Sequence, residues 1–286
     1  MIRYRILHRT RFTYTEPVSL CHNMAHLIPR ECPWQFCEQS QLDVTPPPAV
    51  LDTRTDCFGN MATHFAVQEP HRELTITAVH RIGVLARLRP NAAQTPPWED
   101  IRDRVPEWLH AVQFLHPSCY VIAAEELGRY AMESFTPRRP ILDAALELTH
   151  RIFEDFQYDP QSTTVSTPVL EVFANRRGVC QDFAHLQIAC LRSIGLPARY
   201  VSGYLSTTPP PGRPRLVGAD ASHAWLSIFC GEAGWVDLDP TNDQVAGDRH
   251  IQIAWGRDYD DVSPVKGVIL GGGQHKVEVS VDAEPC

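Results

Sequence analysis

The sequence predicts an α+β protein, with a β-rich N-terminal domain at residues 1–86 and a mixed domain after it. Apolar and polar residues alternate over residues 2–8 and 72–80, which is the period of β-strands. From about residue 99, apolar residues recur at spacings of three and four, which is the helical period. From residue 198 the alternation returns. The chain of 286 residues is long enough for one large domain or two modest ones.

The composition narrows the classes of function. Hydrophobic residues make up 43% of the chain and charged residues 21%, which is ordinary for a globular protein and excludes a mostly disordered chain. The balance of 26 basic and 34 acidic residues gives a formal net charge of −8, and no basic block stands out. We therefore expect no nucleic-acid partner. No stretch approaches the roughly 20 apolar residues that cross a bilayer, so we expect no membrane partner.

The cysteines predict a reducing compartment. The first ten residues, MIRYRILHRT, are charged and lack the apolar segment of a signal peptide. The nine cysteines are odd in number and scattered, and they form no CxxC pair. We therefore expect reduced thiols in a cytoplasmic protein, with no structural zinc. The scattered histidines form no HExxH or similar pattern, so we expect no other metal. Thiol acyl transfer, the chemistry inferred from the residues below, needs no organic cofactor.

The N-terminal domain reads as short strands separated by turns. Beside the two alternating segments, apolar runs at residues 42–44 and 65–67 predict further strands. Proline- and glycine-containing segments at residues 46–48 and 58–60 break them. Residues 87–138 are expected to form a helical connector, because apolar residues recur there at helical spacing.

Residues 139–286 are predicted to form a catalytic core that includes the C-terminal strands. One helix is expected around residues 142–153. A second is expected from Thr167-Pro168, with the threonine as cap and the proline at the first helical position, to Gly178. A third is expected from about Cys180 to Ile194, before the stop Gly-Leu-Pro. Strands are expected at residues 198–206, 222–230, 235–239, 268–270 and 276–282.

Cys180 is the first candidate for chemistry, because it follows a glycine and a valine and begins an amphipathic helix. A helix N-terminus carries partial positive charge and unpaired N–H groups, which favour a thiolate. A backbone N–H there also suits a developing oxyanion. Taken alone, however, a free cysteine is more often a buried apolar residue.

His223 and Asp239 lie on two strands joined by one predicted hairpin. A cysteine at a helix start, a histidine on a strand and an aspartate on the next strand form the arrangement that thiol acyl transfer needs. If residues 231–234 form a simple four-residue loop, Asp239 lies opposite Leu226, on the face away from His223. A bulge, or a loop of three or five residues, places Asp239 opposite Trp225, diagonal to His223 and within side-chain reach. We therefore predict an irregular hairpin, with Asp237 as the competing partner of the histidine.

Three motifs in this part of the chain resemble the bacterial transglutaminase-like superfamily, whose members are often described as cysteine proteases. The segments are GVCQDFAHL followed by GLPARYVSGYL, then DASHAWLSIF, then GWVDLDPTND, and they occur in order over about residues 140–245. The first 86 residues also resemble the β-rich N-terminal region that precedes this core in one bacterial branch. The matching pieces are residues 14–18, 26–30 and 56–60, and the tail at residues 256–264 fits the same branch.

The resemblance implies a papain-like core in which a helix carrying Cys180 packs on an antiparallel sheet carrying His223 and Asp239. Cys180 would be the nucleophile, His223 the general base and acid, and Asp239 the third member. The family's aspartate stands directly before Pro-Thr, which favours Asp239 over Asp237. Gln181 stands where animal transglutaminases have tryptophan, which favours a peptidase or amidase over a crosslinking enzyme.

The neighbouring motif residues carry weaker expectations. Asp182 is a candidate support for the site, although an acidic residue in the first turn of a helix is equally typical. Trp225 and Tyr204 are expected to be cleft walls or core residues. The resemblance further implies a peptide or protein amide as substrate and a place in a peptide-synthesis or peptide-processing system. An amine-accepting transglutaminase and a non-catalytic peptide-binding module remain as alternatives.

Overall fold

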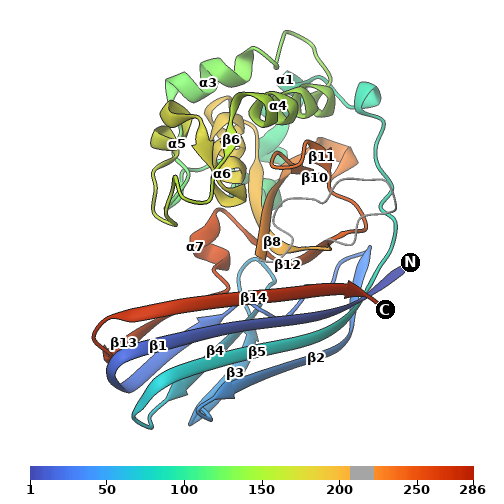
Figure 1. The fold of residues 1–286 in the computed structure, drawn as a ribbon. Coiled ribbons are helices and arrows are strands. Elements are labelled where there is room, and N and C mark those ends of the chain that lie inside the picture. The colour runs from blue at the N-terminus through green and yellow to red at the C-terminus, as the bar shows by residue number, and fades with distance from the viewer. Residues whose placement is uncertain (207–221) are drawn as a thin grey trace.

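The computed structural model describes residues 1–206 and 222–286. It consists of a large antiparallel sheet, a second antiparallel sheet above it, and a layer of helices on the far side of that second sheet (Figure 1). The predicted α+β class and the helix-on-sheet core are confirmed. Within the described residues, no helix has the length and apolar character needed to cross a membrane.

The large sheet is built around one long strand. Its strand order is β2-β5-β1-β4-β3, with bounds β1 Ile2–Ala25, β2 Gln35–Thr45, β3 Val50–Thr55, β4 Met61–Val67 and β5 His71–Val84. The predicted alternation holds in β1, because Tyr4, Ile6 and His8 are buried between exposed or half-buried neighbours. One face of this sheet therefore supplies apolar residues to the interior, as the period of two requires.

The C-terminal strands belong to this large sheet and not to the catalytic core, which corrects the sequence-based assignment. β13 (Val265–Gly271) and β14 (His275–Pro285) both pair with β1, and Figure 1 shows them beside it. On its other side β1 pairs with β5 and β4. Without the C-terminal strands, the 24 residues of β1 would form an open edge with unpaired backbone groups. The local apolar pattern carries no information about which sheet a strand joins.

The second sheet holds the candidate site. Its order is β11-β10-β9-β8-β12, with all pairs antiparallel. The bounds are β8 Ala198–Leu205, β9 Ser222–Phe229, β10 Trp235–Asp239, β11 Gln244–Val245 and β12 His250–Gly256. All three strands expected in this region are present.

Helices cover one face of the second sheet. The central helix α6 (Cys180–Ser193) is buried continuously from Asp182 to Arg192. Around it lie α4 (Ile141–Asp155), α3 (Glu125–Met132) and α5 (Val169–Asn175). The other α-helices of the described residues are α1 (Trp98–Arg104), α2 (Leu109–Val112) and α7 (Tyr259–Val262). Two short strands, β6 (Gln157–Tyr158) and β7 (Arg177–Gly178), form a separate parallel pair. Apolar residues of the 87–138 segment, among them Trp98 and Phe135, share one core cluster with α4 and α6.

The predicted bounds of α5 are wrong by a few residues. The helix begins at Val169, with Pro168 as its N-cap, and ends at Asn175. Arg176 ends it in a left-handed conformation with φ of 55°, so Gly178 is not the terminator. Gly178 instead lies in β7, and its role concerns the next helix.

The other face of the second sheet packs on the large sheet. Tyr4 and Ile82 of the large sheet share an apolar cluster with Tyr204 and Ile251 of the second sheet. The Tyr204 hydroxyl forms a hydrogen bond of 2.8 Å with Nδ1 of His8 in β1. Tyr204, expected at the cleft or in the core, is thus a core residue that joins the two sheets.

Candidate active site

Cys180 is the first residue of α6, and the sequence around it fixes the start of the helix. The carboxylate of Asp182 accepts a hydrogen bond of 2.8 Å from the Val179 N–H, as an acidic residue in the third helical position does in a capping box. The same oxygen accepts a bond of 2.6 Å from the Thr163 hydroxyl, which ties the loop before α5 to the helix start. Asp182 is therefore a support for the turn that carries the thiol.

Gly178 is required by this capping arrangement. A Cβ atom at residue 178 would lie 2.8 Å from both Cβ and Oδ2 of Asp182, which is closer than real contacts allow. The glycine of the GVCQD segment thus makes room for the carboxylate that caps α6. Cys180 itself is partly exposed.

The hairpin between β9 and β10 has the irregularity that the sequence predicts. Trp235 pairs with Phe229 and Leu238 with Leu226, so five residues link the strands and include a short 3-10 turn at Gly231–Ala233. This register places Asp239 on the His223 face, one step beyond the last pair.

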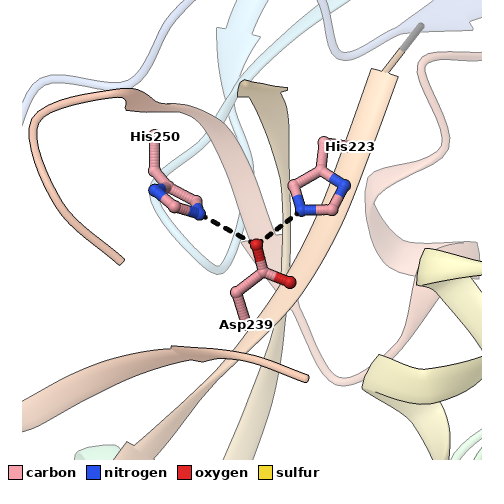
Figure 2. A group of neighbouring side chains, drawn as sticks. All are labelled: His223, Asp239 and His250. Carbon is pink, nitrogen blue, oxygen red and sulfur yellow. Dashed lines mark hydrogen bonds and ion pairs between the residues drawn. The ribbon is translucent and has the colours of Figure 1, made fainter. Parts of the chain in front are cut away.

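Asp239 binds His223 directly. The Nε2 atom of His223 donates to Oδ2 of Asp239 at 2.9 Å, and both side chains are fully buried (Figure 2). The segment after Asp239 folds back on the same carboxylate: the Thr241 N–H donates to Oδ1 at 3.1 Å, and the Asn242 side-chain amide donates to Oδ2 at 2.9 Å. The Asp-Pro-Thr-Asn sequence is therefore a turn that holds its own aspartate, as aspartates at turns commonly do.

The buried pair is charged. Burial disfavours the imidazolium of His223, but the charge of Asp239, its hydrogen bond and the neighbouring Cys180 outweigh burial and raise the pKa of His223 to about 10. Burial also opposes ionisation of Asp239, yet the charge of His223 and the hydrogen bonds from both histidines hold the pKa of Asp239 well below its usual value. The expected state near neutral pH is an imidazolium beside a carboxylate.

The second ring nitrogen of His223 is free for the thiol. Nδ1 is buried, and no described group meets hydrogen-bond geometry with it. The Cys180 thiol nevertheless lies close enough to His223 to raise the pKa of the ring. Asp239 occupies Nε2, so Nδ1 is the ring nitrogen left for the cysteine. The structure thus brings together the three residues that the motifs single out.

Two family models match most of the chain. Residues 4–82 match the bacterial transglutaminase-like N-terminal region, and residues 129–240 match the transglutaminase-like superfamily. An uncharacterized Mycobacterium tuberculosis protein is 43% identical over 99% of this chain and 93% of its own length. The chain belongs to the transglutaminase-like superfamily.

Two further similarities concern fold and local sequence. A Cytophaga hutchinsonii protein, described provisionally as a cysteine protease, superposes with a TM-score of 0.79 over 99% of this chain and 90% of its own, at 22% identity. A Pseudomonas aeruginosa protein-glutamine gamma-glutamyltransferase is 33% identical over 36% of this chain and 16% of its own length. The first similarity shows a shared fold, and the second is confined to a segment.

The remaining motif residues of this transglutaminase-like chain have distinct places. Gln181 lies at the surface, where its side-chain amide donates to the Val165 carbonyl at 3.0 Å. Trp225 is fully buried and donates from Nε1 to Asp237 at 3.2 Å. Asp237 does not bind His223. Its Oδ2 atom accepts from Arg87 and from the Gln252 amide, each at 2.6 Å, so the competing partner is engaged elsewhere.

His250 is a site residue that the sequence analysis missed. Its Nε2 atom lies 3.0 Å from Oδ2 of Asp239, the oxygen that also binds His223 (Figure 2). Its Nδ1 atom accepts from the Gly247 N–H at 3.2 Å, so the ring proton is on Nε2 and is donated to the carboxylate. Burial lowers the pKa of His250, which keeps this ring neutral. No sequence motif marks His250, which is the first residue of β12. In the sheet, β9 and β8 lie between β10 and β12, so local sequence does not indicate that His250 reaches Asp239.

His223, Asp239 and His250 are also the residues best placed to hold a metal ion in the described part of the chain. Their ligand atoms lie within 4.8 Å of one another. Both Nε2 atoms are, however, committed as donors to one carboxylate oxygen. A cation would have to replace those two protons, so the donor set fits a hydrogen-bonded carboxylate better than a metal site.

Proposed function

We propose that the protein is a thiol hydrolase that cleaves an amide or peptide bond through a Cys180 thioester. The observation that supports it is the environment of His223: Asp239 holds Nε2, which leaves the opposite nitrogen for Cys180, a partly exposed cysteine at a helix N-terminus that raises the pKa of the ring. This is the relation of nucleophile, base and orienting group that covalent catalysis requires.

In the proposed reaction the Cys180 thiolate attacks the carbonyl carbon of the substrate. The carbonyl oxygen becomes an oxyanion, and the Cys180 backbone N–H at the start of α6 is a donor for it. His223 then gives its Nδ1 proton to the leaving nitrogen as the carbon–nitrogen bond breaks, and a thioester remains. A water molecule loses a proton to His223, attacks the thioester and releases a carboxylic acid and the free thiolate. Asp239 keeps its negative charge throughout and stabilises the imidazolium.

Transfer of the acyl group to an amine is the second candidate. The segment shared with the Pseudomonas aeruginosa glutamyltransferase favours it. Gln181 favours hydrolysis, because animal transglutaminases carry tryptophan after the nucleophile. A non-catalytic peptide-binding module is the third candidate, and it requires an unreactive Cys180.

The product distinguishes these candidates. The full-length protein is incubated with peptides that contain glutamine and internal amide bonds, with and without a primary amine, and the products are identified by mass spectrometry. A free acid with ammonia or a released amine supports hydrolysis, and a new amide bond to the added amine supports transfer. Cys180→Ser must abolish either product, while Cys119→Ser, which changes an exposed cysteine, must not. No product from a broad peptide set would favour the binding module.

We also propose a small peptide as the substrate and a place in a peptide-synthesis or peptide-processing system. These rest on the family resemblance. A cytoplasmic location is proposed from the cysteines, all nine of which are free thiols.

A further inference from the structure

A cavity of about 640 Å³ lies on the face of the second sheet that points away from α6. The segment at residues 85–90 and the turn at Pro33-Trp34 form one wall, and residues of β10, β11 and β12 form the other. Cys180, His223, Asp239 and His250 are not among the described residues that line it. Its volume is in the range of small-molecule sites. It is therefore separate from the thiol site, although Asp237 on its wall is two residues from Asp239.

Arg199 places a buried positive charge on the wall of this cavity, with Asp237 as a nearby carboxylate that also pairs with Arg87. Its side chain is buried, with 5% of the residue exposed, and its guanidinium lies between the rings of Trp235 at 4.3 Å and Trp255 at 3.6 Å. The Nε–H group is buried without a hydrogen-bond partner in the described part of the chain. Burial lowers the pKa of Arg199 to about 9, which reflects the cost of keeping this cation away from water. A buried donor of this kind is costly unless something pairs with it.

The charges around the cavity are not balanced. Three arginines line it, Arg87, Arg89 and Arg199, against one carboxylate, Asp237, among the described residues. Asp237 is already ion-paired with Arg87 at 2.6 Å. A fourth guanidinium, that of Arg30, lies 3.5 Å from the ring of Trp255. The excess of positive charge favours an anionic occupant.

The rest of the lining is apolar. Val245 and Ala246 lie on the sheet side, and Leu85 and Leu88 on the opposite wall. Leu88 is fully exposed and Leu85 is 38% exposed, so apolar surface is available at this wall. An occupant that is only an inorganic anion would leave these side chains uncovered.

We propose that the cavity binds a small organic carboxylate, with its carboxylate on the guanidinium of Arg199 and its hydrocarbon part against the apolar lining. The carboxylate lies against the guanidinium of Arg199 on the cavity wall, and the positive charge of that group attracts it. The two indole rings hold the guanidinium in place, so little side-chain freedom is lost on binding.

The test uses a matched pair of ligands. Hydrocinnamate carries a carboxylate on a phenyl-substituted chain, and hydrocinnamamide is its uncharged counterpart. Binding is measured by isothermal titration calorimetry on the full-length protein carrying Cys180→Ser, so that the thiol site does not react. We expect the acid to bind at least about tenfold more tightly than the amide, because the amide lacks the charge that pairs with Arg199.

Three variants locate the site. Arg199→Gln is expected to abolish the preference for the acid, while Arg104→Gln, which changes an arginine stacked on Trp108 outside the cavity, is expected to preserve it. If Arg199→Gln does not fold, Ala233→Trp decides, because Ala233 is an exposed lining residue and an indole there fills the cavity. Equal affinities for acid and amide would overturn the proposal. So would unchanged binding in folded Arg199→Gln or Ala233→Trp, or no binding up to about 10 mM of the acid.

Discussion

Replacing Asp239 by asparagine should reverse the charge state of His223 near neutral pH. Asp239 supplies the two main influences that raise the pKa of His223 to about 10, and burial is the largest influence that lowers it. Asparagine keeps the shape but removes the negative charge, so burial should bring the pKa of His223 below its ordinary value of 6.5. Each pKa unit is a factor of ten, so the proton affinity of the ring should fall by more than about 10³-fold.

The assay is an NMR titration of the protein with isotope-labelled histidine, in which the His223 signals are assigned with His223→Ala. The wild-type ring should titrate near pH 10 and the Asp239→Asn ring below pH 6.5. Circular dichroism must show that the variant is folded. Superimposable His223 titrations in the two folded proteins would contradict the role of the Asp239 charge in raising the pKa of His223.

The same change should alter how stability depends on pH. In the wild type, the raised pKa of His223 gives a contribution that is complete below pH 6.5 and is lost as the pH rises through about 10. The depressed pKa of Asp239 gives a contribution that is present above about pH 3.8 and is lost on further acidification. In Asp239→Asn the folded protein should instead lose stability as the pH falls below 6.5, because protonation of the buried, neutral His223 is unfavourable in the folded state. Thermal denaturation at several pH values would detect this change.

Three other perturbations follow from the geometry. His250→Leu should lower the free energy of unfolding, measured by urea denaturation, by about 1–3 kcal/mol, because Asp239 loses a hydrogen-bond donor. His250→Gln keeps a donor and should recover part of that loss. Equal effects of the two substitutions would contradict the assigned hydrogen bond. Gly178→Ala should displace Asp182 and cost about 1–2 kcal/mol, with lower Cys180 reactivity, and wild-type reactivity would argue against the capping role. Removal of residues 265–286 should expose an edge of β1 and cause aggregation in size-exclusion chromatography, and a stable monomer would contradict the sheet assignment.

Local patterns were sufficient for the elements that position the thiol and the imidazole. The start of α6 at Cys180 follows from local sequence, because glycine, a cappable first turn and an apolar face all lie within fifteen residues. The hairpin could be predicted to be irregular because the two side chains have opposite parity in a four-residue loop. The structure chooses the five-residue link, in which Gly231 and Gly234 adopt positive φ angles.

Contacts between distant segments were beyond the same reasoning. His250 reaches Asp239 through the arrangement of the sheet, and strands β13 and β14 join a strand more than 200 residues earlier in the chain, as the Ile6–Ala283 pair shows. Periodicity reports which face of an element is buried and does not report its neighbour. The role of Gly178 was assigned to the wrong helix for a related reason, since only the packed structure shows that Asp182 occupies the space of its missing Cβ.

The most direct test of the account is the rate at which iodoacetamide alkylates Cys180 as a function of pH, followed by peptide mass spectrometry. Cys119 is the internal reference, because it is exposed. Partial burial and nearby aspartates also raise the pKa of its thiol, so it should be a thiol and not a thiolate at acidic pH. At about pH 6, well below the ordinary thiol pKa of about 8.5, we predict that Cys180 reacts at least about tenfold faster than Cys119. We also predict that His223→Ala removes this advantage. Equal rates for the two cysteines in the wild type, or an advantage that survives in folded His223→Ala, would contradict a thiolate–imidazolium pair.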